Sequence, residues 1–147
     1  LRDDVRAALE MNLSNIPNAV IHPYGLGDSQ KEIEFVKSPA TGITTIYKPH
    51  EGHPTMRGNL IPLDQIVLED VDLIKLDLEG YEYEALVGAR ETIAYYTPLV
   101  IAEIHHGRSK RQFQYRQKLF DFMRGLGYSI ADVRKADYVF IHKDRIV

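Results

Sequence analysis

The stretch VDLIKLDLEGYEYEALVGARETIAYYTPLVIAEIHH, from Val71 to His106, decides the fold predicted for this chain. It begins with a short apolar run, Val71–Leu76, which indicates a strand. The segment Tyr81–Tyr95 carries apolar residues at helical spacing, and Thr97-Pro98 ends that helix because a proline restricts the residue before it to extended conformations. Leu99–Ile104 is a second continuous apolar run. Together they form a βαβ unit, whose strands we expect to be parallel and covered on both faces.

Ionisable residues follow both predicted strands. Asp77 and Glu79 come directly after the first strand, and Glu103 and His105 come at the carboxyl end of the second. If the two strands are neighbours, parallel pairing brings these ends to one rim of the sheet. Open α/β sheets bind ligands outside the carboxyl ends of their strands. We therefore expect these four side chains to lie together in a site.

Composition narrows the class of protein. The chain has 147 residues, of which 44% are hydrophobic, and this predicts a single domain over residues 1–147. A net charge of −3 gives no sign of the excess positive charge that favours binding to nucleic acid or to an anionic membrane. The absence of cysteine excludes disulfides, thiolate zinc sites and cysteine nucleophiles. No apolar run approaches the roughly 20 residues needed to span a bilayer, and no signal peptide is visible, so we expect a cytoplasmic soluble protein.

The rest of the chain also carries periodic patterns. A helix is predicted over Leu1–Asn15, and strands are predicted over Ala19–Tyr24 and Lys31–Lys37. Ser38–Gly58 is rich in proline and glycine and predicts a long irregular loop, after which Asn59–Ile66 resumes order.

Downstream of the central unit, a helix is predicted up to about Leu126, followed by an antiparallel pair of strands over Tyr128–Val133 and Ala136–His142. The expected core side of this helix consists of Phe113, Leu119, Phe120, Met123 and Leu126. A basic cluster at its start is open to two interpretations, a solvated face or a group that steers an anionic substrate; it consists of Arg108, Lys110, Arg111 and Arg116.

The segment LIKLDLEGYEYEALVGA, Leu73–Ala89, resembles the signature of the FkbM-type S-adenosylmethionine-dependent methyltransferases, which reads roughly I-K-x-D-x-E-G-x-E-x-x-x-L-x-G-A. Upstream, Leu60–Asp64 is similar to the leucine-aspartate step of this family, and Gly27-Asp28 is similar to the step after its third strand. Downstream, Pro98–His105 is similar to its proline-to-glutamate strand. The resemblance implies an α/β fold with a Rossmann-like class I methyltransferase sheet, mostly parallel with an antiparallel C-terminal strand pair.

The resemblance also shows which family features are absent. Class I methyltransferases hold S-adenosylmethionine on a glycine-rich turn after their first strand, and no such turn is present. Gly25-Leu26-Gly27 leads towards a hairpin strand, not a helix. By this alignment Leu1 falls just after the second strand, so we expect a fragment that lacks the first two strands. Strand edges left open by that loss favour oligomerisation.

The resemblance implies methyl transfer from S-adenosylmethionine, which we expect to act on a hydroxyl of a small molecule or sugar. Asp77 and Glu79 are then the catalytic candidates, one of them as general base. Glu103 and His105 complete the substrate pocket, and Asp28 meets the adenine edge of the cofactor. We expect neither nucleic acid nor a membrane as partner.

Each assignment has a structural alternative. Glu79, Glu82 and Glu84 are also suited to a solvated first turn of a helix. Lys75 is a candidate ion-pair partner for Asp77, and Asp28 is also suited to an ordinary turn. His105 and His106 can cap a strand without binding a ligand.

Two other functions stay open. One is a divalent-metal-dependent hydrolase in which Asp77, Glu79, Glu103 and His105 bind the cation. The other is a non-catalytic remnant that acts by association. A second histidine pair, His50 and His53, is three residues apart in the proline- and glycine-rich loop, which favours plain surface over a metal site.

Overall fold

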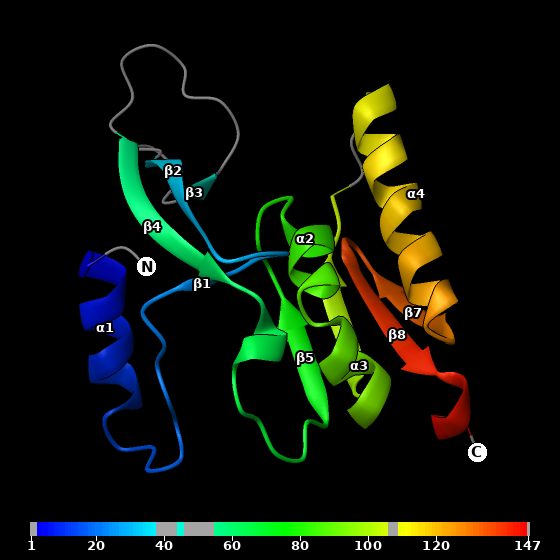
Figure 1. The fold of residues 1–147 in the computed structure, drawn as a ribbon, viewed down its shortest axis with the longest axis horizontal. Coiled ribbons are helices and arrows are strands. Elements are labelled where there is room, and N and C mark those ends of the chain that lie inside the picture. The colour runs from blue at the N-terminus through cyan, green and yellow to red at the C-terminus, as the bar shows by residue number, and fades with distance from the viewer. Residues whose placement is uncertain (1–2, 38–43, 46–54, 106–108, 147) are drawn as a thin grey trace.

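A computed structural model describes residues 3–37, 44–45, 55–105 and 109–146 of the chain. The described chain contains both helices and strands (Figure 1). In chain order the elements are α1 (Asp3–Leu13), β1 (Gly25–Leu26), β2 (Lys31–Lys37), β3 (Thr44–Thr45), β4 (Thr55–Ile61), η1 (Leu63–Gln65), β5 (Leu73–Leu76), α2 (Glu82–Val87), α3 (Arg90–Tyr96), β6 (Leu99–Glu103), α4 (Lys110–Gly125), β7 (Tyr128–Arg134), β8 (Asp137–His142) and η2 (Lys143–Arg145). In this part of the chain no helix combines the length and the apolar character that a membrane span requires.

The strands form two sheets, which lie on opposite sides of α2 and η1 in Figure 1. The first has the order β1-β4-β2-β3, and the second has the order β5-β6-β8-β7. Among the strands that the structure describes, β1 pairs with β4 and β5 pairs with β6 in parallel, and the other four pairings are antiparallel. The predicted α/β class is therefore confirmed. The prediction of one mostly parallel sheet is not met by the described strands, because β2 and β4 join as an antiparallel pair in a sheet of their own.

The predicted βαβ unit is present. β5 and β6 are parallel neighbours, with Leu73 opposite Leu99 and Leu76 opposite Ala102. The antiparallel pair β7 and β8 closes this sheet, as predicted.

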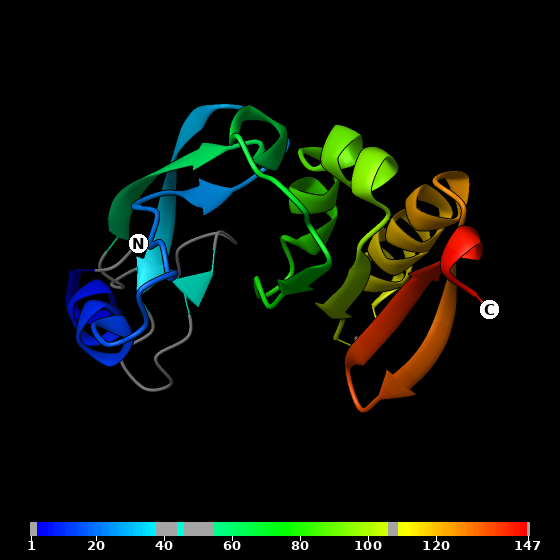
Figure 2. The same cartoon turned by 90° about the horizontal axis from the view of Figure 1, so that it is seen from below.

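The prediction that both faces of this sheet are covered is wrong for the described residues. Burial alternates strictly along β5 and β8, and the buried face is the one that meets the helices. Figure 2 shows α2, α3 and α4 gathered over that one face. The other face carries Leu73, which is 54% exposed, and the charged residues Lys75 and Glu103. Continuous apolar runs in a strand therefore do not prove burial on both sides.

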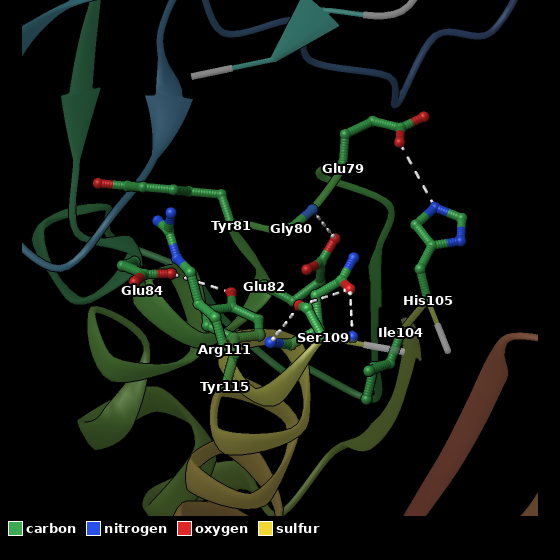
Figure 3. Close-up of a pocket in the computed structure, with 11 residues that line it drawn as sticks. Glu79, Gly80, Tyr81, Glu82, Glu84, Ile104, His105, Ser109, Arg111 and Tyr115 are labelled. Atoms are coloured by element: carbon green, nitrogen blue, oxygen red, sulfur yellow. Dashed lines mark hydrogen bonds and ion pairs between the residues drawn. The ribbon is translucent and has the colours of Figure 1, made fainter. Parts of the chain in front are cut away.

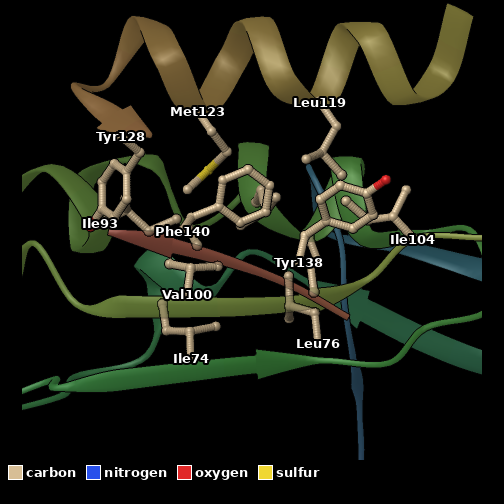
Figure 4. Close-up of a cluster of buried hydrophobic side chains, with 14 residues drawn as sticks. Ile74, Leu76, Ile93, Val100, Ile104, Leu119, Met123, Tyr128, Tyr138 and Phe140 are labelled. Atoms are coloured by element: carbon tan, nitrogen blue, oxygen red, sulfur yellow. The ribbon is translucent and has the colours of Figure 1, made fainter. Parts of the chain in front are cut away.

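The hydrophobic core lies between this sheet and its helices (Figure 4). Leu119 and Met123 reach down from α4 onto Phe140 of β8 and Val100 of β6. The predicted core side of α4 is confirmed for these two residues, and Phe120 and Leu126 are partly buried against the same cluster. Phe113 is the exception, since it is 55% exposed, and the guanidinium of Arg116 lies 5.6 Å from its ring centroid.

The helix predicted over Tyr81–Tyr95 is two helices. α2 ends at Val87 and α3 begins at Arg90. A Cβ on Gly88 would lie 1.9 Å from the carbonyl oxygen of Gly27. The turn between α2 and α3 therefore packs directly against the backbone that follows β1. Asp64 then replaces the interrupted helical bonds: its N–H donates to the Gly88 carbonyl at 2.9 Å, and its carboxylate accepts from the Glu91 and Thr92 N–H groups.

Three flanking predictions are revised. The strand expected over Ala19–Tyr24 is absent; the strand in this region is Gly25–Leu26, which pairs with Leu60 and Ile61 of β4. The long loop expected over Ser38–Gly58 ends earlier, since β4 starts at Thr55; most of its remainder lies outside the described residues. The helix predicted over Leu1–Asn15 and the strand over Lys31–Lys37 are confirmed as α1 and β2.

Candidate active site

Asp77 and Glu103 lie side by side at the carboxyl rim of the second sheet. The register that pairs Leu76 with Ala102 puts the residues after them at the same level. The negative charge of Asp77 raises the pKa of Glu103 above its usual value, and a hydrogen bond that protonated Glu103 donates to Asp77 adds to this effect. The sequence prediction that these two carboxyl groups meet at one rim is confirmed.

Glu79 and His105 form a second contact at this rim. His105 Nε2 lies 3.4 Å from Glu79 Oε2, and both side chains are partly exposed. Glu79 has a φ of +52° and Gly80 a φ of +97°, so two consecutive residues adopt left-handed backbone conformations. Such a conformation is rare for glutamate. The backbone turn after β5 therefore determines where the Glu79 carboxylate points.

Glu82 holds that turn. Its Oε1 accepts the N–H of Leu78 at 3.0 Å and the N–H of Gly80 at 3.1 Å. The residue is only 1% exposed. The sequence allowed Glu82 to be a solvated residue of a first helical turn, and this alternative is wrong.

A cavity of about 720 Å³ opens beside these residues (Figure 3). Its walls come from the β5–α2 turn, the end of β6 and the first turns of α4. The lining consists of Glu79, Gly80, Tyr81, Glu82, Glu84, Ile104, His105, Ser109, Arg111, Gln112 and Tyr115. In Figure 3 the Glu79 and His105 side chains face one another.

The structure separates the four predicted site residues into two pairs. Glu79 and His105 line the cavity, whereas Asp77 and Glu103 do not. From the sequence Lys75 is one candidate partner for Asp77, but its ion pair in the structure is with Asp137, whose Oδ1 lies 2.6 Å from Lys75 Nζ. That hydrogen bond to Asp137 is the main reason why the pKa of Lys75 is raised; the charges of Asp77 and Glu103 contribute less.

Asp28 lies outside the lining of this cavity. Its Oδ1 accepts from Lys31 Nζ at 2.6 Å and from the Ser29 hydroxyl at 3.2 Å. The bond from Lys31 lowers the pKa of Asp28. Lys31 Nζ in turn lies 5.8 Å from the ring centroid of Tyr81, a cavity residue. Lys31 therefore links Asp28 to this cavity residue.

Several lining residues were not predicted. Tyr115 links α4 to α2: its hydroxyl donates to Glu84 Oε2 at 3.0 Å and accepts from the Tyr83 N–H at 2.9 Å. Burial raises the pKa of Tyr115. Ser109 begins α4 in a capping box with Gln112. The Ser-x-x-Gln spacing is a signal that could have placed this helix start, but nothing in the sequence pairs Tyr115 with Glu84, which lies 31 positions away.

Within the described ranges no three His, Asp or Glu side chains gather closely enough to hold a metal ion. The hydrolase alternative, which needed Asp77, Glu79, Glu103 and His105 around one cation, therefore gains no support. His50, His53 and His106 lie outside the described residues.

Comparison with known proteins adds two findings. Residues 6–130 match the methyltransferase FkbM domain. The structure is similar to the crystal structure of methyltransferase FkbM from Methylobacillus flagellatus KT, with a TM-score of 0.57 and 17% sequence identity. The similarity covers 95% of this chain and 33% of that one, so the chain spans about a third of the length of that protein. At this identity the likeness concerns the fold. No curated protein matches the sequence significantly.

Proposed function

The chain belongs to the FkbM methyltransferase domain family, and we propose that the protein transfers a methyl group from S-adenosylmethionine to a hydroxyl of a small molecule or sugar. The observation that carries the proposal is the Glu79–His105 pair in the lining of the 720 Å³ cavity. Cavities of roughly 300–1,000 Å³ are typical of small-molecule sites.

The cavity has the chemistry that such a reaction needs. Bound S-adenosylmethionine supplies a methyl group activated by a sulfonium centre. The Glu79 carboxylate and the Tyr81 ring, both in the lining, favour a cationic centre by charge and by cation–π attraction. Asp28 stays a proposed adenine contact on the family resemblance alone, and it would have to share its carboxylate with Lys31.

Methyl transfer to a hydroxyl requires that the hydroxyl loses its proton. We assign this general-base role to Glu79, because it lines the cavity and Asp77 does not. His105 contacts Glu79 Oε2 and orients the carboxylate, while its exposed side leaves room for the acceptor. Asp77 and Glu103 lie outside the cavity lining, and the charge of Asp77 raises the pKa of Glu103, which disfavours a second negative charge at this rim.

We also propose the finer features that the family resemblance implies. The sheet of the protein has a Rossmann-like arrangement, the protein forms an oligomer where strand edges are open, and it acts in the cytoplasm. We propose neither nucleic acid nor a membrane surface as a partner, because the net charge of −3 does not favour binding to polyanions.

Methyl transfer by the whole protein tests the function. Tritium-labelled S-adenosylmethionine is incubated with the protein and a panel of hydroxylated small molecules and sugars, and label in the acceptor is counted. Glu79→Gln should lower kcat by about 10²–10⁴-fold, the usual contribution of a general base. The labelled cofactor should still bind, with an affinity weakened by the loss of the Glu79 charge.

Glu91→Gln is the matched control, since Glu91 is an exposed glutamate on α3 and is not part of the cavity lining. It should retain wild-type turnover. If the whole protein neither binds labelled S-adenosylmethionine nor labels any acceptor, a non-catalytic role by association takes the place of this proposal.

A further inference from the structure

The buried carboxylate of Glu82 has no role in the proposed methyl transfer itself. It lies within the cavity lining but is 1% exposed, so a bound acceptor cannot reach most of it. Burying a carboxylate is unfavourable unless it is hydrogen-bonded. Here the donors are the N–H groups of Leu78 and Gly80, which both point at Oε1.

These two donors belong to the turn that precedes α2, not to the helix. In Figure 3 the bond from the Gly80 N–H runs directly below the Glu79 side chain. Glu79 lies between the two donors in sequence and has the left-handed φ of +52°. A glutamate in this conformation persists only where its surroundings enforce it, and the paired bonds to Glu82 supply that enforcement.

We infer that Glu82 is a positioning residue of the site: by closing the Leu78–Gly80 turn, it keeps the Glu79 carboxylate against His105. The catalytic meaning of this inference rests on the proposed function, because Glu79 is a general base only there. The conformational part does not, since it concerns the backbone turn alone.

Three variants of the whole protein separate the possibilities. Glu82→Ala removes the acceptor. Glu82→Gln keeps an oxygen at the same reach and is the conservative rescue, and Glu91→Gln is the control for loss of an exposed glutamate. Native-state amide exchange is followed at Leu78 and Gly80, with Val100 and Phe140 in the core as internal references for global stability.

In Glu82→Ala we expect exchange at Leu78 and Gly80 to speed up by about tenfold or more, because a lost charged acceptor exposes its donors. Val100 and Phe140 should keep nearly wild-type protection, and Glu82→Gln should recover most of the local protection. In the methyl-transfer assay kcat should follow the same order, falling at least about tenfold in Glu82→Ala, with a smaller change in KM.

Unchanged exchange at Leu78 and Gly80 in a folded Glu82→Ala protein overturns the inference. So does a kcat that stays at the wild-type value while the turn loosens. If Glu82→Ala does not fold, the exchange of Glu82→Gln alone tests the inference. Equal loss of protection at the turn and in the core of Glu82→Gln would mean that Glu82 supports only the global fold, which overturns the inference. A wild-type protein without methyl transfer refutes the proposed function, whereas the exchange comparison still tests the turn.

Discussion

The ionisation of Glu103 depends on its neighbour Asp77. The first cause of its raised pKa is the charge of Asp77, and hydrogen bonding to the same side chain adds to it. Asp77→Asn removes that charge and offers an amide donor. The ionised form of Glu103 is then favoured, and the pKa of Glu103 should fall towards its ordinary value.

Carbon-13 NMR titration of the Glu103 side-chain carboxyl measures this change. Asp121→Asn is a control, because Asp121 is exposed on α4 and bonds to Arg124. It should leave the Glu103 titration as it is. An identical Glu103 curve in wild type and Asp77→Asn would show that the two carboxyl groups do not interact in solution.

Gly88, in the turn between α2 and α3, packs closely against the backbone that follows β1. A Cβ at this position would meet the Gly27 carbonyl oxygen at 1.9 Å, and backbone cannot yield as a flexible side chain can. Gly88→Ala should lower the free energy of unfolding by about 1–3 kcal/mol or more, the range found for overpacking.

Urea unfolding of Gly88→Ala and Gly125→Ala compares a crowded glycine with an open one. No atom lies within 4 Å of a Cβ on Gly125, the last residue of α4. Alanine there should be neutral or stabilise by up to about 1 kcal/mol. Equal midpoints for the two variants would refute the close packing of Gly88 on Gly27.

At the scale of elements, the start of α3 depends on a side chain from η1. Asp64 accepts the Glu91 N–H at 3.0 Å, the Thr92 N–H at 2.9 Å and the Thr92 hydroxyl at 2.8 Å. Ala89, the local cap residue, makes no side-chain capping bond. Asp64→Ala should therefore destabilise the protein by about 1–2 kcal/mol, as loss of an N-cap does.

Asp64→Asn retains an oxygen acceptor and should lose much less stability than Asp64→Ala. The melting temperatures of the two variants measure this difference. The prediction fails if alanine and asparagine at this position give the same melting temperature as the wild type. This arrangement also gives the aspartate of the leucine-aspartate pair, Asp64, a structural role. It caps a helix whose first N–H groups lie 27 and 28 residues further along the chain.

At the scale of the whole molecule, the two sheets have unequal cores. Phe35 and Leu60 are the buried hydrophobic residues of the described first-sheet strands, and neither belongs to the large cluster under α4. Segments with few buried contacts open with lower free energy. Amides of β2 and β4 should exchange at least about 100-fold faster than those of β6 and β8.

Hydrogen exchange of the native protein, resolved by residue, checks this ranking. A matched pair is Phe35 in β2 and Phe140 in β8, which are both buried phenylalanines in strands. Equal protection of their amides would mean that both sheets open in a single step.

The elements at the centre of the chain were predictable because their signals are local. Apolar runs and a proline located β5, β6 and the end of the helix, and adjacent parallel strands then required Asp77 and Glu103 to share a rim. The break at Gly88 was not predictable in the same way. Its causes, the Gly27 carbonyl and the Asp64 carboxylate, come from distant positions.

The sequence by itself determined the α/β class, the βαβ unit, the family and the rim that holds the ionisable groups, since periodicity and motif spacing are written in consecutive residues. Tertiary structure alone decided that Glu79 and His105 line the cavity while Asp77 and Glu103 do not, that Lys75 bonds to Asp137, and that Glu82 is buried. These outcomes depend on which side of a turn or strand meets a helix. That choice is made by packing between segments far apart in the chain, which no local pattern records.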